Sequence, residues 1–574
     1  MLLTWWLSLA IIHTVVSTPL VKAPSGTFQG TTLISKSGRA YSAFLGIPYA
    51  KPPVEDLRFR PPVPATALDG VYDATEFKPI CIQVNIVPVG HDFGPGEEDC
   101  LYLNIYAPES AVSNKEEQKK VFVFIYGGGN CNGFTNIYIP GQLVTEQDII
   151  VVTISYRLGY LGFLSTLTPS CEGNFGLKDQ LLAISWVKEN ILAFGGDPND
   201  ITVGGESAGA IDISFLSLVP DSKNLFTKAF PMSGLSSVKH PAVVRNPLPT
   251  FVQTAQKAGC LGEGQDELDS DDDLDEIVDC LRKVPASTFG MDFGFKIPDL
   301  GPVEYGSLFP KPIEELFNDE SYLDSIKFFD RDYLISFVYN EGDFFNIIKQ
   351  EAEALLSEEQ RKAFPPNAWT LGIMTQFVNS AFGPVSDKVI EKVMEYYNKN
   401  YEINPLADFA ADALFHIPTI DWANTATRGF SIEKSKVHML RFVHWPMFMA
   451  GPYKGMVHGT DLLYLFDTEP EFINKIINLH VNGSLWGEED DYLKQKYISI
   501  AADFIKTGNP GISLGSALPV GWPAYDEHEG HYLQFGLRLE VKTQFKPERV
   551  RLWSTQIPEW IDTFPLEQPD HSEL

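Results

Sequence analysis

The sequence has few basic residues for its length. Its 574 residues include 44 Lys and Arg against 75 Asp and Glu, which gives a formal net charge of −31 at pH 7. Phosphate backbones and anionic lipid surfaces repel a chain this acidic. We therefore expect neither nucleic acid binding nor electrostatic binding to membranes.

Long apolar runs are also scarce. The first stretch is the exception, with an apolar run from Leu2 to about Val16 and small residues near Ser17. This run is too short for a convincing membrane span. It predicts a signal peptide over residues 1–17, although no Lys or Arg precedes it, and a buried first strand or helix is the alternative. No later run approaches the ~18 apolar residues of a span, so no transmembrane anchor is expected.

Cysteine is sparse, and its spacing does not indicate metal binding. The six cysteines are Cys81, Cys100, Cys131, Cys171, Cys260 and Cys280. Because there is no C-x-x-C pair and no cluster of histidines, we predict no metal site. The oxidising lumen that a signal peptide implies would favour disulfides, but spacing alone does not establish their pairing.

Two short motifs concern location and modification. Residues 571–574 (HSEL) are close to the HDEL and KDEL retention signals, which leaves retention in the endoplasmic reticulum and secretion as alternatives. Asn482 begins an N-G-S sequon and is the expected glycosylation site, with a chance occurrence as the alternative.

Alternating strand-like and helix-like runs predict an α/β fold. The apolar runs over 119–129 and 147–159 are typical of strands buried on both faces. Residues 177–196 have helical spacing and end in glycines, and residues 197–205 form a short strand-like run. This order favours a central sheet covered by helices.

The chain contains no long linker, low-complexity tract or internal repeat. We therefore expect one domain over residues 18–570, with a more helical part from about 350 to 450. The acidic run over 263–279 lacks the ligand spacing of an EF-hand, so it is predicted to be a solvated helix face and loop.

One serine lies among unusually small residues. Ser207 is the centre of the G-x-S-x-G motif G-E-S-A-G at 205–209. At a sharp turn from strand to helix, this motif presents the serine hydroxyl at the edge of a sheet. The pentapeptide alone is also compatible with an ordinary turn. The strand-like run before it and the helix-compatible run after it favour a nucleophile.

A nucleophilic serine needs a base, usually a histidine oriented by a carboxylate. His458 lies between small residues just before an apolar run, and Glu341 directly follows a strand-like run. Each alone would more simply be a turn residue, but both follow Ser207 in the order that this kind of fold requires.

The reaction also needs hydrogen-bond donors for the oxyanion. Three glycines at 127–129 follow a predicted strand and can turn their amides toward one point. We expect the amides of Gly128, Gly129 and Ala208 to form this oxyanion hole. A phosphate-binding loop is disfavoured because the required Lys-Ser/Thr is absent.

Together these motifs resemble the type-B carboxylesterase/cholinesterase family of α/β-hydrolases over most of the chain. The resemblance also includes FLGIPYAKPPVEDLRFRPP (44–62), EEDCLYLNIYAP (97–108), NEGDFF (340–345) and HGTDLLYLF (458–466). It implies an α/β-hydrolase fold, with a large, mostly parallel central sheet flanked by helices. It further implies Ser207 as nucleophile, His458 as general base and Glu341 as its orienting acid.

The resemblance also implies buried pairs and disulfides. The disulfides are Cys81–Cys100 and Cys260–Cys280, and the ion pairs are Arg58–Glu98 and Arg157–Asp179. Cys131 and Cys171 fall outside this scheme and are either free or paired with each other.

Tyr126 and Asn130 depart from the family pattern. Many carboxylesterases have His where Tyr126 stands, although the backbone donors should survive either residue. Asn130 stands where an aromatic residue is usual, which implies a more polar pocket near the acyl group. The loop between Cys81 and Cys100 lacks the tryptophan that a choline-binding relative needs, so a cholinesterase is disfavoured even though Tyr126 is typical of one.

The sequence thus predicts a serine carboxylesterase that acts on small-molecule esters through an acyl-enzyme on Ser207, without a cofactor. A hormone or pheromone esterase is the narrower alternative, although juvenile hormone esterases usually carry Gln where Glu206 stands. A non-catalytic adhesion or binding relative is the alternative from another class. The oligomeric state is left open.

Overall fold

The computed structural model describes most of the chain. The described residues are 18–83, 96–114, 116–237, 240–262, 264, 270–290, 300–304, 306–359, 367–428, 436–449, 455–468, 485–518 and 521–566. The predicted signal peptide, the sequon at Asn482 and the tail at 571–574 lie outside them. None of the helices in these ranges has the length and apolar character that a bilayer crossing requires.

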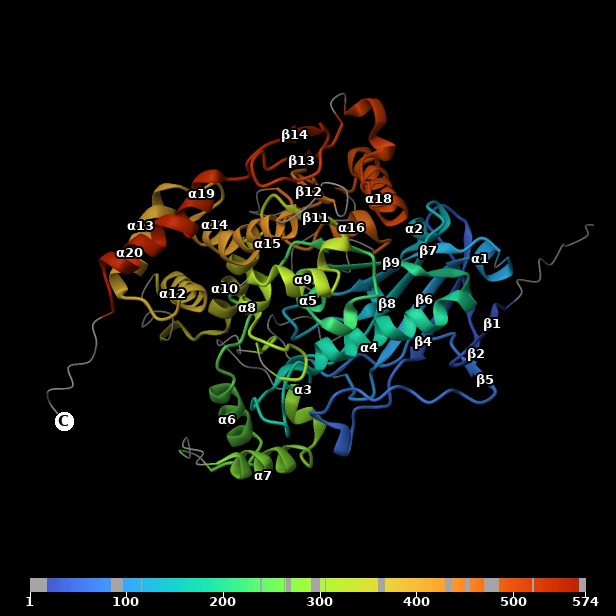
Figure 1. The fold of residues 1–574 in the computed structure, drawn as a ribbon, viewed down its shortest axis with the longest axis horizontal. Coiled ribbons are helices and arrows are strands. Elements are labelled where there is room, and N and C mark those ends of the chain that lie inside the picture. Colours follow the sequence, from blue (N-terminus) through green and yellow to red (C-terminus); the bar gives the residue numbers. More distant parts are fainter. Residues whose placement is uncertain are drawn as a thin grey trace, which may run out of the picture.

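A large sheet forms the centre of the molecule (Figure 1). Within the described ranges, its strands are ordered β14-β13-β12-β11-β10-β9-β7-β8-β6-β4-β3. Neighbours from β13 to β8 pair in parallel, and the pairs at both ends are antiparallel. The predicted sheet, mostly parallel and flanked by helices, is confirmed.

The strands of this sheet are β3 (Thr31–Ile34), β4 (Ala40–Pro48), β6 (Tyr102–Pro108), β7 (Lys119–Ile125), β8 (Ile150–Ile154), β9 (Gly196–Glu206), β10 (Lys228–Met232), β11 (Asp332–Val338), β12 (Val437–Phe442), β13 (Tyr532–Phe535) and β14 (Glu540–Lys542). A smaller sheet of three strands comprises β1 (Leu20–Ala23), β2 (Gly26–Gln29) and β5 (Val71–Asp73).

β7 and β8 lie inside the predicted runs but are shorter, and β8 covers only Ile150–Ile154 of the run over 147–159. β7 and β8 consist mainly of Val, Ile and Phe, which suit a pleated surface, and nearly all their side chains are buried. Strands covered by helices on both faces need no polar side. The strand predicted over 119–129 ends at Ile125, because the three glycines that follow turn the chain away.

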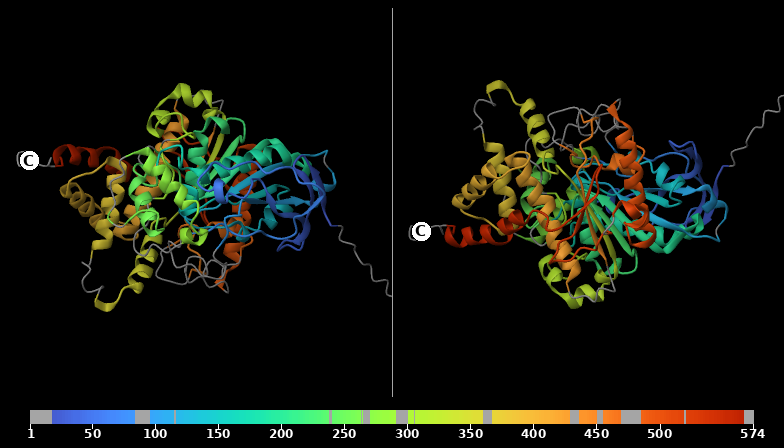
Figure 2. Two further views of the ribbon diagram at one scale, coloured as in Figure 1. Left: turned by 90° about the horizontal axis from the view of Figure 1, so that it is seen from below. Right: turned by 90° about the horizontal axis from the view of Figure 1, so that it is seen from above.

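The described helices cover both faces of the sheet or pack outside it. They are α1 (Glu109–Ser113), α2 (Gly141–Thr145), α3 (Gly159–Phe163), α4 (Phe175–Asn190), α5 (Ala208–Ser217), α6 (Leu248–Lys257), α7 (Asp271–Leu281), α8 (Ile313–Asn318), α9 (Glu320–Ser325), α10 (Phe344–Leu355), α12 (Ala368–Phe382), α13 (Asp387–Lys399), α14 (Pro405–Ala411), α15 (Ile417–Thr427), α16 (Leu462–Leu465), α18 (Glu488–Thr507), α19 (Pro547–Arg551) and α20 (Ile557–Thr563). α4 and α18 lie on opposite faces (Figures 1 and 2).

The helix predicted over 177–196 is shorter than expected at its C-terminal end. α4 ends at Asn190, and a 3₁₀ turn over Ile191–Phe194 leads to Gly195, whose φ is 87°. Only glycine adopts this left-handed conformation readily, so the chain leaves the helix there.

The helices α10, α12, α13, α14, α19 and α20 form a helical region at the end of the molecule opposite the small sheet (Figures 1 and 2). This agrees with the helical character predicted for about 350–450. The region has a hydrophobic cluster of its own, to which α10, α12, α13, α14 and the C-terminal helices contribute. A π-helical turn over Asp412–His416 joins α14 to α15.

The described residues include two disulfides. Cys81 is joined to Cys100, and Cys260 to Cys280. Cys131 and Cys171 are both free and buried, which rules out the pairing left open for them.

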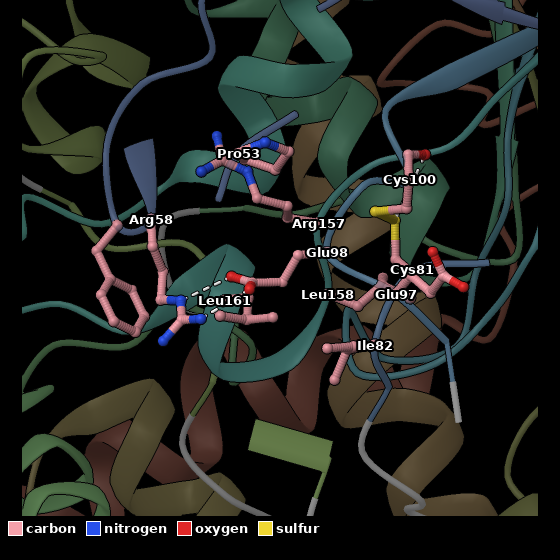
Figure 3. Close-up of a pocket in the computed structure, with 11 residues that line it drawn as sticks. Pro53, Arg58, Cys81, Ile82, Glu97, Glu98, Cys100, Arg157, Leu158 and Leu161 are labelled. Atoms are coloured by element: carbon pink, nitrogen blue, oxygen red, sulfur yellow. Dashed lines mark hydrogen bonds and ion pairs between the residues drawn. A yellow bond between two sulfur atoms is a disulfide. The ribbon is translucent and has the colours of Figure 1, made fainter. Parts of the chain in front are cut away.

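Near Cys81–Cys100, the Arg58 guanidinium donates to both carboxylate oxygens of Glu98 at 2.7 Å (Figure 3). Arg157 makes the same kind of pair with Asp179, also at 2.7 Å. The Arg157–Asp179 pair joins a loop to α4. Both pairs are buried, so removing one partner would leave a buried charge uncompensated.

Part of the acidic run forms α7, as predicted for a solvated helix face. Ser270 and Asp273 make reciprocal capping hydrogen bonds at its start, and three aspartates occupy its first turn. Negative charge at a helix N-terminus is favourable. Residues 263 and 265–269 of this run lie outside the described residues.

Candidate functional site

Ser207 occupies a sharp turn between β9 and α5. Its φ and ψ are 55° and −122°, a conformation that costs a residue with a side chain ~1–3 kcal/mol. Its N–H donates to the Met232 carbonyl oxygen at 2.9 Å, which ties the turn to β10. The strain is held by the surrounding backbone and directs the hydroxyl away from the sheet.

The glycines around Ser207 make this turn possible. A Cβ atom on Gly209 would lie 2.2 Å from the Ile125 carbonyl oxygen, and one on Gly205 would lie 2.7 Å from the Gly209 backbone. Both distances are far below van der Waals contact, so larger residues would displace α5 or β7.

Three side chains predicted from the sequence form a hydrogen-bonded chain. The Ser207 Oγ lies 2.8 Å from His458 Nε2, and His458 Nδ1 lies 2.6 Å from Glu341 Oε2. Glu341 is fully buried, and its Oε1 also accepts from Ser233 Oγ and from the Val338 N–H, each at 2.7 Å. With Nδ1–H donating to Glu341, Nε2 is free to accept the proton of Ser207.

Sheet topology brings these residues together. β9, β10, β11 and β12 run in parallel, so their carboxyl ends meet at one edge. Asn340 and Val457 pair in an isolated parallel bridge, which places the next residues of the two segments, Glu341 and His458, beside each other. Ser207 and His458 are 251 positions apart in the sequence, so only the tertiary fold joins them.

Two further carboxyl groups lie close to His458. Glu206 Oε1 is 3.3 Å from His458 Nε2, and burial raises the pKa of Glu206 to about 8. Burial, followed by the charge of Glu341, raises the pKa of Asp461 to about 7. Glu206 precedes the nucleophile in the sequence, and the structure places its carboxyl group against the imidazole.

These groups change the titration of His458 itself. Burial disfavours the imidazolium, but Glu206, the hydrogen bond to Glu341 and Asp461 outweigh it and raise the pKa of His458 to about 9. The protonation states of Glu206 and His458 are therefore coupled. An ionised Glu206 favours the imidazolium, and a protonated Glu206 favours the neutral base.

Aromatic rings shield the imidazole. The ring centroid of Phe415 is 4.6 Å from that of His458, and the Phe344 centroid is 5.8 Å away. Phe415 comes from the π-helical turn and Phe344 from α10, so the helical region covers a histidine that the sheet positions. No local signal around 344 or 415 predicted this contact.

The glycine run lies directly against Ser207. A Cβ atom on Gly127 would come within 2.7 Å of Ser207 Cβ, and one on Gly128 within 2.1 Å of the Asn132 carbonyl oxygen. Gly128 and Gly129 have φ of 110° and 62°. Such backbone conformations favour glycine and allow successive amides to face the same cavity.

A cavity of about 320 Å³ opens in front of Ser207. Gly128, Gly129, Ala208 and His458 border it, so all the predicted site residues of the reaction centre meet there except Glu341, which lies behind His458. Its wall is mainly apolar and includes Phe134, Ile137, Tyr138, Ile348, Phe377 and Leu463.

Asn130 borders this cavity, but its side chain is engaged elsewhere. Its amide nitrogen donates to Asp212 Oδ1 at 2.9 Å, and its oxygen lies 3.3 Å from the Tyr156 hydroxyl. Both partners lie on the buried side of the loop. This corrects the expectation of a more polar acyl pocket at this residue.

Within the described ranges, no group of three or more His, Cys, Asp or Glu side chains is arranged to hold a metal ion.

Comparison with known proteins agrees with this geometry. The model of the Carboxylesterase family matches residues 17–553. Carboxylesterase 1C of Rattus norvegicus is 31% identical over 567 residues, which cover 94% of this chain and 93% of that protein. The juvenile hormone esterase of Tribolium castaneum is 30% identical over 604 residues, covering 96% and 95%. Acetylcholinesterase-1 of Trittame loki is 41% identical over 276 residues, covering 47% and 49%.

Proposed function

The chain belongs to the carboxylesterase family and is a carboxylic ester hydrolase, and we propose that it cleaves small-molecule esters through an acyl-enzyme on Ser207. The observation that carries this proposal is the hydrogen-bonded chain from Ser207 through His458 to Glu341 at a strained turn. The same three residues disfavour a non-catalytic binding protein, because such a protein has no need for this strained arrangement.

In the proposed first step, Ser207 Oγ attacks the ester carbonyl carbon and His458 Nε2 takes the hydroxyl proton. The carbonyl oxygen becomes an oxyanion that accepts hydrogen bonds from the amides of Gly128, Gly129 and Ala208. The carbon–oxygen bond to the alcohol then breaks, and His458 returns the proton to the leaving alcohol. Glu341 stabilises the imidazolium formed between these events.

In the second half, water replaces the alcohol. His458 takes a proton from the water, whose oxygen attacks the acyl-enzyme carbonyl, and the same amides hold the second oxyanion. The bond to Ser207 Oγ breaks, Ser207 regains its proton from His458, and the acid leaves. The full cycle consumes one ester and one water, releases one alcohol and one acid, and regenerates Ser207 and His458 without a cofactor.

The cavity favours esters with apolar parts. Its wall consists largely of aromatic and aliphatic side chains. The carboxyl group of Glu206 borders it, and the charge of Asp461 acts on Glu206 from behind the wall. An uncharged ester avoids both the cost of burying a charge and repulsion from these groups.

A narrower hormone-esterase function is a second candidate, favoured by the similarity to the juvenile hormone esterase of Tribolium castaneum and by the apolar cavity. The ratio of kcat/KM for long isoprenoid methyl esters to that for short aryl esters distinguishes it from general hydrolysis. A ratio above ~100 would favour the hormone function.

We also propose that the protein matures in the secretory pathway, as an oxidising compartment preserves its disulfides. Microscopy of the full chain with and without residues 571–574 tests retention in the endoplasmic reticulum against secretion.

Replacement of Ser207 by alanine tests the reaction proposal. Ser207→Ala should reduce kcat for a short-chain aryl ester by ~10⁴-fold or more, because no other group can form the acyl-enzyme. An unchanged circular dichroism spectrum controls for folding. Activity near that of the wild type would exclude the proposed role of Ser207.

A further inference from the structure

A buried side-chain contact joins the glycine run to the helix that follows Ser207. Asn130 comes directly after the three glycines, and Asp212 lies in α5. Asn130 Nδ2 donates to Asp212 Oδ1 at 2.9 Å, and the two residues are only 4% and 0% exposed. Neither residue takes part in the proton transfers proposed above.

The contact belongs to a larger network that holds both ends of the glycine run. On one side, Gln180 Nε2 from α4 donates to Asp212 Oδ2 at 2.6 Å. On the other, the Tyr156 hydroxyl donates to the Tyr126 carbonyl oxygen at 2.8 Å and lies 3.3 Å from Asn130 Oδ1. Tyr126 precedes the glycines and Asn130 follows them, so residues 127–129 are anchored at each end.

The backbone of Asn130 is also restrained. Its φ is 57°, a left-handed conformation that Asn tolerates better than most residues. Its carbonyl oxygen accepts from the Gly159 N–H at 2.7 Å. The side chain and the main chain of one residue therefore tie the end of the glycine run to two different elements.

The geometry matters because the three expected oxyanion donors come from two segments. The amides of Gly128 and Gly129 belong to the loop after β7, whereas that of Ala208 is the first of α5. Asp212 follows Ala208 by one helical turn, on the same face of α5. Errors of about 0.5 Å in such an arrangement reduce transition-state stabilisation.

We propose that Asn130 and Asp212 are positioning residues that hold the glycine run in register with the start of α5, so that the amides of Gly128, Gly129 and Ala208 converge on one oxyanion. The inference rests on the proposed ester hydrolysis and concerns the alignment of the oxyanion-hole amides. Without the contact, the loop and the helix would still be packed, but nothing polar would fix their mutual position at this point.

The chemistry of Asp212 supports a specific need for this contact. Its carboxyl group is fully buried and accepts from two neutral amides, so its charge is poorly compensated, and burial raises its pKa to about 7. An isolated buried carboxyl group lowers stability compared with an apolar residue. A role in alignment accounts for its presence in a helix that is otherwise mostly apolar at its start.

Single and double substitutions test the proposal. Asp212→Ala and Asn130→Gly should each lower kcat by ~10- to 100-fold, with KM changed less than about threefold, since the donors act on the transition state. Glycine at 130 removes the side chain without straining the left-handed backbone. The double variant should be no slower than the worse single variant, because both remove the same contact.

Two further variants separate alignment from general damage. Asp212→Asn keeps the shape and can accept from Asn130, and Gln180 can turn its Oε1, which is otherwise without a hydrogen-bond partner, toward the new amide. It should retain kcat within about threefold of the wild type. Ser217→Ala removes a buried hydrogen bond elsewhere in α5, from Ser217 Oγ to the Ile213 carbonyl oxygen, and should lower Tm but not kcat.

Titration with an organophosphate gives the concentration of active sites, and each rate is divided by that concentration. Unfolded protein therefore does not lower the value of kcat. Unchanged kcat in both Asp212→Ala and Asn130→Gly, or losses that multiply in the double variant, would overturn the inference. If Ser207→Ala is inactive while these variants retain kcat, only the inference fails. If Ser207→Ala remains active, the proposed function fails first.

Discussion

The two sides of the active-site cavity are built by different means. On the sheet side, strained turns and hydrogen bonds of 2.6–2.8 Å hold Ser207, His458 and Glu341. On the helical side, residues such as Phe377 contribute to a separate hydrophobic cluster and line the cavity through packing alone. Packing tolerates changes in side-chain shape better than a reaction centre tolerates displacement. Chemistry and substrate choice can therefore vary independently in this molecule.

The largest effect expected on the sheet side, apart from loss of the nucleophile, is that of Glu341→Gln. The amide keeps the size of the side chain but no longer favours the His458 tautomer that accepts from Ser207, so kcat should fall by ~10³- to 10⁴-fold. Steady-state kinetics on a short aryl ester measure it. Asp343→Asn is the matched control, because Asp343 is a nearby buried carboxylate bonded to Asn340 and Asn346, and its kcat should change less than about twofold.

One glycine-to-alanine substitution on the sheet side and one on the helical side test the difference between the two sides. Gly127→Ala would place a Cβ 2.7 Å from Ser207 Cβ, so we expect kcat/KM to fall by ~100-fold or more. In α12, a Cβ on the exposed Gly372 would meet nothing within 4 Å. Gly372→Ala should leave kinetics unchanged and raise stability by ~0.5–1 kcal/mol, seen as a higher Tm. Equal kinetic effects from both changes would contradict the division of roles.

A substitution in the cavity wall should change substrate preference and leave the rate of the chemical step nearly unchanged. Phe377→Leu should raise kcat/KM for bulky acyl esters relative to short ones by ~10-fold, because it enlarges the helical side. For the shortest ester, kcat should remain within about twofold. A uniform loss across all esters would indicate that Phe377 supports the reaction centre itself.

The smallest effect concerns pH. The carboxylate of Glu206 raises the pKa of His458, and only the neutral imidazole accepts the serine proton. Glu206→Gln removes that charge, so the pKa of His458 falls and the acid limb of the kcat/KM profile moves to lower pH. Profiles of both enzymes between pH 5 and 10 measure the shift. If the acid limb of the kcat/KM profile stays in place or moves to higher pH, Glu206 does not raise the pKa of His458.

Local signals predicted the central strands, and they also pointed to the residues that the structure brings together around Ser207. β7 and β8 are recognisable because their residues are almost continuously apolar, as in strands buried on both faces, and Ser207 is recognisable because its turn requires small neighbours. Glu341 and His458 were recognisable by chain order and by family motifs. The one-domain organisation, the signal peptide and glycosylation at Asn482 remain predictions.

Contacts between distant segments were not predictable in this way. The bond from Asn130 to Asp212 spans 82 positions, and Phe415 reaches His458 only because a π-helical turn carries it there. Asn130 is the clearest example, because its polarity implied a polar pocket while its partner lies behind the loop. Nothing in the sequence around Asn130 indicates Asp212 as its partner, and nothing around Asp212 indicates Asn130.

The most direct test of the account is to trap the acyl-enzyme. The protein is mixed with a p-nitrophenyl ester, quenched in acid within milliseconds, and measured as an intact chain and as peptides by mass spectrometry. The account predicts one added acyl group per active chain, located on the peptide that contains Ser207 and missing in Ser207→Ala. Rapid turnover with no covalent adduct, or an adduct that persists in Ser207→Ala, would contradict it.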